Sequence, residues 1–352
     1  MNAKNIVFSL ACITGVVVMA SRFLGNLTSS QESQYLKIAK MINSDPSSTW
    51  KANEDVPTFS LLKSFETRLG LKIESSVPES FDEPPVYKTL LSELPESLDL
   101  REAFPNCEAI KEIRDQSACG GCWAFGAVSA MTDRLCIASG QNDQRRISSE
   151  DLLECCESCG FGCDGGFLYQ SWAYWKQSGL VTGNLYGDQK TCKPYQFPPC
   201  NHHSSGPFDD CVKHQYVAPR CKTECYNPSY STPYNQDKIF GLKAYTVEGE
   251  HQLIQELNNF GSVEVAFRVY EDFFLYKSGV YKHTTGEYKG AHAVKIIGYG
   301  VENGVKFWIV VNSWNENWGD KGTFKMLRGV NHCGIEASGV AGIPKTDSAM
   351  YA

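Results

Sequence analysis

The spacing of hydrophobic positions changes near the middle of the chain. Residues 122–138 contain no proline, and apolar side chains recur there at three- and four-residue intervals, which predicts a buried helix beginning at or beside Cys122. Three later runs, 262–270, 293–299 and 306–311, are rich in β-branched and aromatic residues and are bounded by glycine or asparagine turns, which predicts strands. We therefore expect a β-rich second half.

The N-terminal region has a different texture. Residues 34–41 and 58–71 have apolar positions near the helical period, which predicts two helices, and the three prolines of 77–86 favour an extended segment. Residues 21–93 contain no cysteine, whereas residues 107–225 contain thirteen. We therefore predict a separable pro-region at 21–93. The alternative is a permanent domain, but the segment has too few apolar residues for a core of its own.

The first 20 residues are typical of a secretory signal. Lys4 precedes an apolar stretch at 6–19 that ends in small residues suited to cleavage. A transmembrane anchor is the alternative, but this stretch makes only about 21 Å of helix, short of the ~30 Å hydrocarbon core. Asn26 begins a sequon and is a predicted glycosylation site.

Composition restricts the partners and the compartment. The formal net charge is −7 and the pI is about 5.6, so the chain lacks the basic excess typical of proteins that bind nucleic acid or anionic membranes. Fifteen cysteines are too many for a reducing compartment unless they bind metal. Their number therefore indicates an oxidising compartment.

Three segments carry candidate catalytic residues. The run QSACGGCW places Cys122 at the start of the predicted helix, where unpaired backbone N–H groups and the helix dipole favour a thiolate. His292 lies in GAHAV, and Asn312 begins NSW. Considered singly, each residue also has a structural interpretation: a buried cysteine, a core histidine and a turn asparagine.

Together these motifs resemble those of the papain family of cysteine proteases. The resemblance implies an α+β, papain-like two-domain fold with the active site in the cleft between the domains. The helical left domain would lie at about 108–240 and the β-barrel right domain at about 241–345. The peptidase domain as a whole would span 94–352, after a signal peptide at 1–20 and an inhibitory propeptide at 21–93.

The resemblance also assigns a role to each catalytic residue. Cys122 would attack the peptide carbonyl as a thiolate, and His292 would stabilise the thiolate and pass a proton to the leaving amine. Asn312 would orient the imidazole. Gln116 and the backbone N–H of Cys122 would stabilise the oxyanion.

Within this family the similarity is strongest to cathepsin B, through segments such as 113–116 and 333–336. The inserted segment 198–211 resembles the occluding loop of cathepsin B, where paired histidines, here His202 and His203, hold the C-terminal carboxylate of the substrate. The resemblance therefore implies removal of dipeptides from C-termini. A metal site at the two histidines is the alternative; adjacent histidines splay apart, and we expect neither a metal nor a cofactor.

Two ion pairs dock this loop in cathepsin B, and the chain keeps the residues for one of them. Asp115 and His202 remain, whereas Phe208 and Asn317 occupy the positions of the other pair. We therefore expect docking to be firm while His202 is protonated and to fade as the pH rises through its titration. Endopeptidase activity should then grow toward neutral pH.

The resemblance also implies a set of substrate-binding residues. Backbone groups of Gly165 and Gly166 would pair with an extended peptide, and Ala291 and Trp314 would line the cleft. Ser338 stands where the mammalian enzyme has an acidic residue, at the floor of the pocket for the side chain two places before the cleaved bond. This predicts a preference for apolar or aromatic residues there and weak acceptance of arginine.

The cysteine count fits the same family. Once Cys12 is removed with the signal and Cys122 is set aside as the nucleophile, the family framework pairs twelve cysteines and leaves Cys333 free. Spacing alone does not fix connectivity, so the pairs are implied by the resemblance. They are Cys107–Cys136, Cys119–Cys163, Cys155–Cys221, Cys156–Cys159, Cys192–Cys225 and Cys200–Cys211.

The sequence thus predicts a zymogen of a cathepsin B-like cysteine peptidase in the secretory pathway, destined for the lysosome or for extracellular fluid, including a digestive lumen. Expected partners are protein and peptide substrates, the propeptide as inhibitor and cystatin-like inhibitors. We expect no nucleic acid, no stable membrane insertion and a monomer. The alternative is a catalytically impaired homologue that binds peptides or inhibitors, for which Ala291 and Ser117, two replacements of glycine near the cleft, would be the first suspects.

Overall fold

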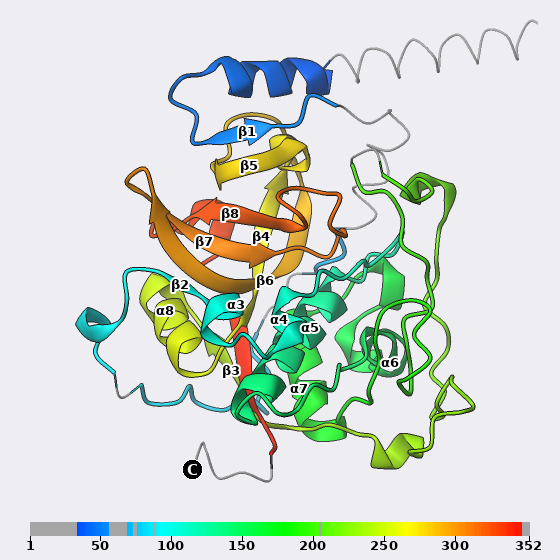
Figure 1. Ribbon diagram of the computed structural model, residues 1–352. Helices are drawn as coiled ribbons and strands as arrows, with labels where there is room; N and C mark the ends of the chain where they lie inside the picture. Colours follow the sequence, from blue (N-terminus) through cyan, green and yellow to red (C-terminus); the bar gives the residue numbers. More distant parts are fainter. Residues whose placement is uncertain (1–33, 56–68, 73–75, 88, 204–205, 347–352) are drawn as a thin grey trace, which may run out of the picture.

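The computed structural model describes residues 34–55, 69–72, 76–87, 89–203 and 206–346 (Figure 1). The helices α5–α7 gather on one side of the molecule, and most of the strands form the other side (Figure 1). In the described ranges, no helix combines the length and the apolar character needed to span a bilayer.

The helices have the following bounds. Besides an unlabelled helix at 34–44, they are α3 (Leu100–Ala103), α4 (Glu108–Lys111), α5 (Cys122–Ala138), α6 (Ser149–Cys155), α7 (Leu168–Ser178) and α8 (Gly249–Asn259). Short 3₁₀ turns are η1 (Leu91–Glu93), η2 (Glu157–Cys159), η3 (Gly162–Asp164), η4 (Cys211–Lys213), η5 (Tyr234–Gln236), η6 (Glu271–Leu275) and η7 (His332–Gly334).

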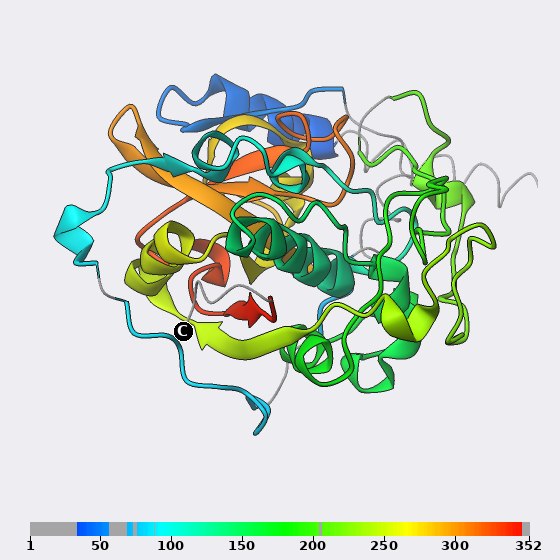
Figure 2. The ribbon, with the colours of Figure 1, turned by 60° about the horizontal axis from the view of Figure 1, so that its bottom comes forward.

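The long helix α5 lies in the middle of the molecule, between the other helices and the sheet (Figure 2). Every residue of α5 except Ser129 is buried, as expected of a helix packed on all faces. Two buried ion pairs join it to the sheet side, Arg134 to Glu256 at 2.8 Å and Asp133 to Lys295 at 2.7 Å. The predicted helix at 122–138, beginning at Cys122, is confirmed.

The strands form one highly curved, mainly antiparallel sheet. They are β1 (Trp50–Ala52), β2 (Leu98–Asp99), β3 (Gly241–Val247), β4 (Val263–Tyr270), β5 (Tyr276–Tyr281), β6 (Tyr288–Glu302), β7 (Val305–Val311), β8 (Thr323–Leu327) and β9 (Gly339–Pro344). Their order is β1-β5-β8-β7-β6-β4-β9-β3, and β2 pairs with β6.

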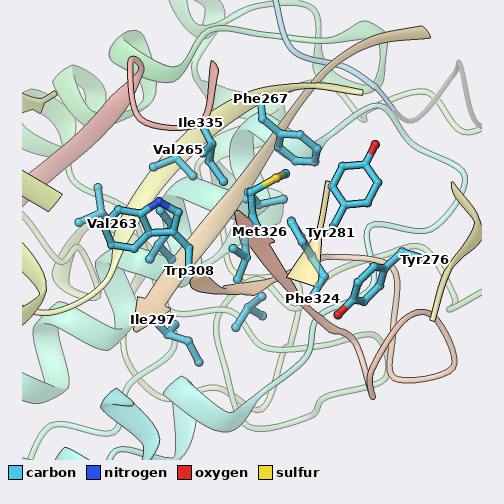
Figure 3. Close-up of a cluster of buried hydrophobic side chains, with 14 of the residues drawn as sticks. Val263, Val265, Phe267, Tyr276, Tyr281, Ile297, Trp308, Phe324, Met326 and Ile335 are labelled. Atoms are coloured by element: carbon cyan, nitrogen blue, oxygen red, sulfur yellow. The ribbon is translucent and has the colours of Figure 1, made fainter. Parts of the chain in front are cut away.

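The three predicted strand runs correspond to β4, β6 and β7, which are neighbours in the sheet. Their inward side chains, including Val265, Phe267 and Trp308, pack with Phe324 and Met326 in the interior (Figure 3). These runs are rich in β-branched and aromatic residues and are buried over most of their length, which explains why they were recognisable in the sequence.

The N-terminal segment packs on the sheet side instead of forming a core of its own. Its helix at 34–44 and β1 lie at one end of the sheet, where β1 pairs with β5 (Figure 1). Tyr35, Ile38 and Trp50 are buried in the same cluster as the sheet interior. The predicted helix at 34–41 is confirmed.

Two other predictions concern this segment. Residues 77–86 contain no helix and no strand, as predicted for an extended run. The helix predicted at 58–71 falls mostly outside the described residues. Its last three positions, Leu69 to Leu71, are described and are not helical, because the chain is extended here and pairs with another segment.

The described residues form six disulfides, and their pairing is the one that the family framework implies. Four of them, from Cys119–Cys163 to Cys192–Cys225, secure the helical side, where long stretches between η3 and β3 contain little regular structure. Crosslinks of this kind reduce the entropy of the unfolded chain. Among the described cysteines, Cys122 and Cys333 are free.

Candidate active site

Cys122 is the first residue of α5 and is fully buried. The preceding Gly121 caps the helix without a side-chain hydrogen bond, so backbone N–H groups of the first turn remain available at the sulfur. The backbone N–H of Ala293, the residue after His292 in β6, hydrogen-bonds the sulfur. This contact joins the end of α5 directly to the strand that carries His292.

His292 and Asn312 form the second element of the site. The Nε2 atom of His292 and the Oδ1 atom of Asn312 are 2.8 Å apart, and both residues are buried. The Trp314 ring stacks on the imidazole with centroids 4.7 Å apart, and Phe267 contacts it edge-on at 6.0 Å. The pair is thus shielded from water and held in one orientation.

Gln116 is held by a residue that the sequence analysis did not single out. The hydroxyl of Ser313 donates to Oε1 of Gln116 at 2.6 Å, and Nε2 of Gln116 donates to the carbonyl of Cys119 at 2.8 Å. The first bond fixes which end of the amide is the donor. Ser313 lies inside the NSW motif, so its position beside Asn312 was the available signal.

The N-terminal segment occupies the cleft. The carbonyl of Gly70 accepts a hydrogen bond from the N–H of Gly166 at 2.8 Å, and the backbone N–H of Lys72 donates to the carbonyl of Gly166 at 2.8 Å. Leu71, between them, forms a parallel bridge with Gly166. A Cβ on Gly70 would lie 1.8 Å from the carbonyl oxygen of Gly120, so only glycine fits here. The edge predicted to bind substrate is therefore filled by the chain itself.

Burial controls the ionisation of the two reactive groups in this closed cleft. It raises the pKa of the Cys122 thiol to about 11, against hydrogen bonds from the backbone N–H groups of Ala293 and Gly70. It lowers the pKa of His292 to about 4, although the hydrogen bond with Asn312 acts in the opposite direction. Both groups are thus neutral near pH 7 here, unlike the thiolate that the helix N-terminus alone would favour.

A cavity of about 300 Å³ opens beside this site. Two of the predicted substrate-binding residues, Ala291 and Ser338, line it, together with Ala266 and Cys333. Leu71 of the N-terminal segment also lines this cavity. Ser338 therefore lines a cavity beside the catalytic residues, and its part in substrate selection stays a prediction.

The segment 198–211 is closed by the Cys200–Cys211 disulfide and packs against the cleft. Nε2 of His202 lies 2.6 Å from Oδ1 of Asp115, which is the predicted ion pair. His203 is buried against Trp314, with ring centroids 4.8 Å apart. Burial raises the pKa of Asp115, but the charge and hydrogen bond of His202 outweigh it, so this pKa lies below its ordinary value.

Other contacts replace the ion pair that this chain lacks. The side chain of Asn201 bonds the backbone of Phe208 in both directions, so the loop is tied internally. Asn315 donates to the carbonyl of Cys200 at 2.8 Å and to Asp115 at 2.9 Å. The hydroxyl of Ser117 donates to the carbonyl of Pro198 at 2.7 Å.

In the described chain, two groups of residues each bring three potential metal-ligand atoms close to one another. They are Cys200, His202 and Cys211, and Asp151, Glu154 and Cys155. The cysteines of both groups are in disulfides, so neither group offers a thiolate. In the second group, Lys193 also pairs with both carboxylates. Neither donor set suits a metal ion.

A cysteine at a helix N-terminus, joined to a strand with a histidine–asparagine pair and lying beside an amide donor, defines a thiol protease site. The family model for the papain family cysteine proteases matches residues 94–343, and the chain belongs to this family. Within the family it is cathepsin B-like, as the comparisons with individual proteins show.

Two curated relatives carry cathepsin B-like names. The chain is 51% identical over 263 residues to cathepsin B-like cysteine proteinase 6 of Caenorhabditis elegans, covering 74% of this chain and 69% of the relative. It is 44% identical over 312 residues to the cathepsin B-like cysteine proteinase of Schistosoma japonicum, covering 88% and 91%.

Solved structures of proforms have the same fold. Procathepsin B S9 from Trypanosoma congolense matches with a TM-score of 0.75 and 35% identity over 88% of this chain and 98% of that one. Digestive procathepsin L 3 of Tenebrio molitor matches with a TM-score of 0.63 at 20% identity, covering 90% of each chain. The chain is therefore a cathepsin B-like cysteine protease with the form of a zymogen.

Proposed function

We propose that the protein is a cysteine endopeptidase and peptidyl-dipeptidase that works through an acyl-enzyme. One observation carries this proposal. Cys122, at the start of α5, contacts the strand β6 that carries His292, and Nε2 of His292 lies 2.8 Å from Oδ1 of Asn312. Such an arrangement supplies a nucleophile, a proton carrier and a residue that orients the carrier.

In the open cleft, the proton of the Cys122 thiol passes to His292, and the thiolate attacks the peptide carbonyl carbon. The carbonyl oxygen becomes an oxyanion that accepts hydrogen bonds from Nε2 of Gln116 and the backbone N–H of Cys122. The intermediate collapses as the C–N bond breaks and His292 gives its proton to the leaving amine. Water then attacks the thioester with His292 as the base, which releases the acid and the free thiol.

The loop at 198–211 supports the peptidyl-dipeptidase activity. Its closed position is maintained by Asp115 and His202, and His203 packs on Trp314 at the same end of the cleft. Two adjacent imidazoles suit the C-terminal carboxylate of a substrate that ends two residues beyond the cleaved bond. A peptide with a C-terminal amide should therefore lose dipeptides more slowly than the same peptide with a free carboxylate.

We also propose the processing and location of the chain. A signal peptide would span 1–20, a propeptide 21–93 and the peptidase domain 94–352, with glycosylation at Asn26. The contact of Gly70 with the catalytic sulfur and the pairing with Gly166 support inhibition by the propeptide. The mature enzyme would be a monomer in the lysosome or in extracellular fluid, open to cystatin-like inhibitors.

Serine in place of an acid at position 338 supports a preference for certain substrate residues two places before the cleaved bond. We expect apolar or aromatic residues two places before the cleaved bond to be preferred. A Phe-Arg reporter should therefore be cleaved much faster than an Arg-Arg reporter. Equal kcat/KM values for the two would contradict this.

The experiment that tests the proposed activity is hydrolysis of the Phe-Arg reporter by acid-activated protein in the presence of thiol. A Cys122→Ser variant is the control, and an epoxide inhibitor of papain-like enzymes is the titrant. Activity that is absent in the control and is titrated one-to-one supports the proposal. If the protein does not hydrolyse the reporter after confirmed removal of the N-terminal segment, an impaired peptide-binding homologue is favoured. Ala291→Gly and Ser117→Gly would then be the first variants to test for recovery of activity.

A further inference from the structure

The pocket that contains Ser338 has a charged residue that the sequence offers no reason to select. Arg268 lies on β4, is exposed, and lines the cavity together with Tyr169 and Cys333. In the sheet, Arg268 pairs with Ala291, and the preceding Phe267 pairs with His292. Arg268 therefore lies one position from the register of the catalytic histidine and contributes to the lining of the neighbouring cavity.

The described lining of the pocket includes no acid that would neutralise this arginine, and the nearby carboxylate of Asp272 already pairs with His283. Neither Asp nor Glu is among its described lining residues, and Arg268 forms no ion pair within the described chain. Burial raises the pKa of the Cys333 thiol to about 12, so this thiol is neutral, while the nearby charge of Arg268 acts to lower the same pKa. The other cation in the lining, Lys72, belongs to the N-terminal segment.

The walls around Arg268 are mostly small and apolar. Ala266, Ala337 and Leu168 line the cavity, and Ser338 contributes a short neutral side chain. A glutamate side chain has two methylene groups that suit such walls and a carboxylate that suits a guanidinium. An arginine side chain would instead bring a second positive charge to Arg268, with no acid at position 338 to offset it.

We propose that this pocket, besides taking apolar and aromatic residues, uses Arg268 to bind a carboxylate side chain, glutamate or aspartate, two residues before the cleaved bond in preference to a neutral polar side chain of the same shape. The proposal rests on the proposed peptidase function and names a substrate class for the same cleft. Aromatic residues still bind through the apolar walls. Arg268 adds a preference for acidic residues over neutral polar residues of the same shape, and it gives a second reason, besides Ser338, to expect weak acceptance of arginine.

The test compares four dipeptidyl reporters, Glu-Arg, Gln-Arg, Phe-Arg and Arg-Arg, on the acid-activated enzyme near pH 6, where the glutamate side chain is ionised. We expect kcat/KM for Glu-Arg to exceed that for Gln-Arg about 2- to 5-fold, as for an ion pair open to water on one side. Arg268→Met should bring this ratio to about 1, and Arg268→Lys should preserve part of it. Arg268→Glu should reverse the preference and favour Arg-Arg.

A matched control removes a positive charge elsewhere. Lys277 is exposed on β5 and does not line the pocket, so Lys277→Met should leave the Glu-Arg to Gln-Arg ratio unchanged. A ratio near 1 in the unmodified enzyme, or one that survives Arg268→Met, overturns the proposal while Phe-Arg cleavage continues. Absence of Phe-Arg cleavage by the activated enzyme would overturn the peptidase function itself, and this proposal with it.

Discussion

At the scale of single residues, the orientation of the Gln116 amide depends on one hydroxyl. Ser313→Ala removes the donor to Oε1 of Gln116, so the amide loses the contact that aims Nε2 at the oxyanion. We expect kcat on the Phe-Arg reporter to fall about 10-fold, with KM nearly unchanged. Gln116→Ala, which removes the oxyanion donor itself, should cost about 10²-fold to 10³-fold.

Steady-state kinetics of the two variants, together with their thermal unfolding, check this. Ser313→Thr keeps a hydroxyl and serves as the matched control. If Ser313→Ala had the full kcat of the parent enzyme, the hydroxyl would have no part in orienting the oxyanion donor.

Ser117 shows why a departure from a family pattern needs a structure to interpret it. Its backbone φ is +57°, a conformation that favours glycine, yet a serine occupies the position. Its hydroxyl bonds the carbonyl of Pro198 at the base of the inserted loop. We infer that this bond offsets the backbone strain and ties the loop to the irregular segment that carries Gln116.

Ser117→Ala keeps the Cβ and removes only the hydroxyl. We expect a loosened loop, with the ratio of endopeptidase to dipeptidase activity rising about 2- to 5-fold, as for loss of one hydrogen bond of ~1 kcal/mol. The measurement uses an internally quenched peptide with blocked ends and one with a free C-terminus. Ser117→Gly should give the same ratio as Ser117→Ala but a higher thermal stability than Ser117→Ala, because glycine also relieves the backbone strain. Identical ratios in the parent enzyme and both variants would count against the inference.

The residues predicted from the sequence were those whose identity carries the chemistry. Cys122, His292 and Asn312 stood out because a nucleophile, a base and an orienting amide occur in recognisable local motifs. Arg268 did not, because its position at the pocket depends on the register between β4 and β6, which no local pattern shows. Ser117 and Ser313 were visible in the motifs, but their partners lie 81 and 197 residues away.

At the scale of elements, the end of the N-terminal segment is attached through Asp82. Its carboxylate pairs with Lys176 of α7 at 2.7 Å and accepts the N–H of Ala244 in β3, so it bridges both sides of the molecule. Burial raises the pKa of Asp82, but Lys176 and the Ala244 N–H outweigh it, so this pKa lies below its ordinary value. The contribution is therefore present above about pH 4 and is lost as the pH falls through the lowered pKa.

Asp82→Asn should weaken this attachment by about 1 kcal/mol, because the ion pair is only partly buried. The zymogen should then convert to mature enzyme several-fold faster at pH 5, as followed by gel electrophoresis of the purified protein. Glu83→Gln is the control, since Glu83 is an exposed neighbour of the same charge. Equal conversion rates in the two variants would show that Asp82 does not hold the segment.

We expect the docking of the inserted loop to depend on pH through the contact between Asp115 and His202. The pKa of Asp115 lies below its ordinary value, so its carboxylate stays ionised from pH 5 upward, and we attribute the expected change to the charge of His202. We expect the endopeptidase to dipeptidase ratio of the mature enzyme to rise from pH 5 to pH 7.5. His202→Gln should abolish this rise by holding the ratio at its high value throughout; a flat profile in the unmodified enzyme would exclude the pair as the cause.

Elements with a strong local pattern were predicted well, and elements that depend on another segment were not. α5 has periodic apolar positions, the strands β4, β6 and β7 are rich in β-branched and aromatic residues, and all four are found where the sequence placed them. The short strand β1 was missed, because its three residues become a strand only by pairing with β5, more than 220 residues away. The helix prediction was wrong at position 71 for a similar reason. The apolar residues before it recur at the helical period, but Leu71 pairs with Gly166, a contact that the local sequence does not show.

At the scale of the whole molecule, the N-terminal segment acts on the chemistry by excluding water from the cleft. With the cleft closed, the pKa of His292 is about 4, against an ordinary value of about 6.5, so the closed form binds fewer protons than an open, hydrated form between these values. Lowering the pH through this window therefore favours opening, by up to about 3 kcal/mol once the pH reaches 4. Acid would thus both release the segment and produce the imidazolium that stabilises the thiolate.

If opening of the cleft is coupled to protonation of His292, alkylation of Cys122 in the intact zymogen should have an unusual pH dependence. An ordinary thiol reacts more slowly as the pH falls, because its thiolate is lost. Cys122 should instead react faster with short pulses of iodoacetamide as the pH is lowered from 7 to 4.5, as measured by mass spectrometry of the uncleaved chain. Cys333 is an internal control in the same molecules, since burial raises its pKa to about 12 and its reaction should only slow in acid. His292→Gln should remove the acid acceleration at Cys122, and a Cys122 rate that falls with pH like that of Cys333 would show that opening is not coupled to the protonation of His292.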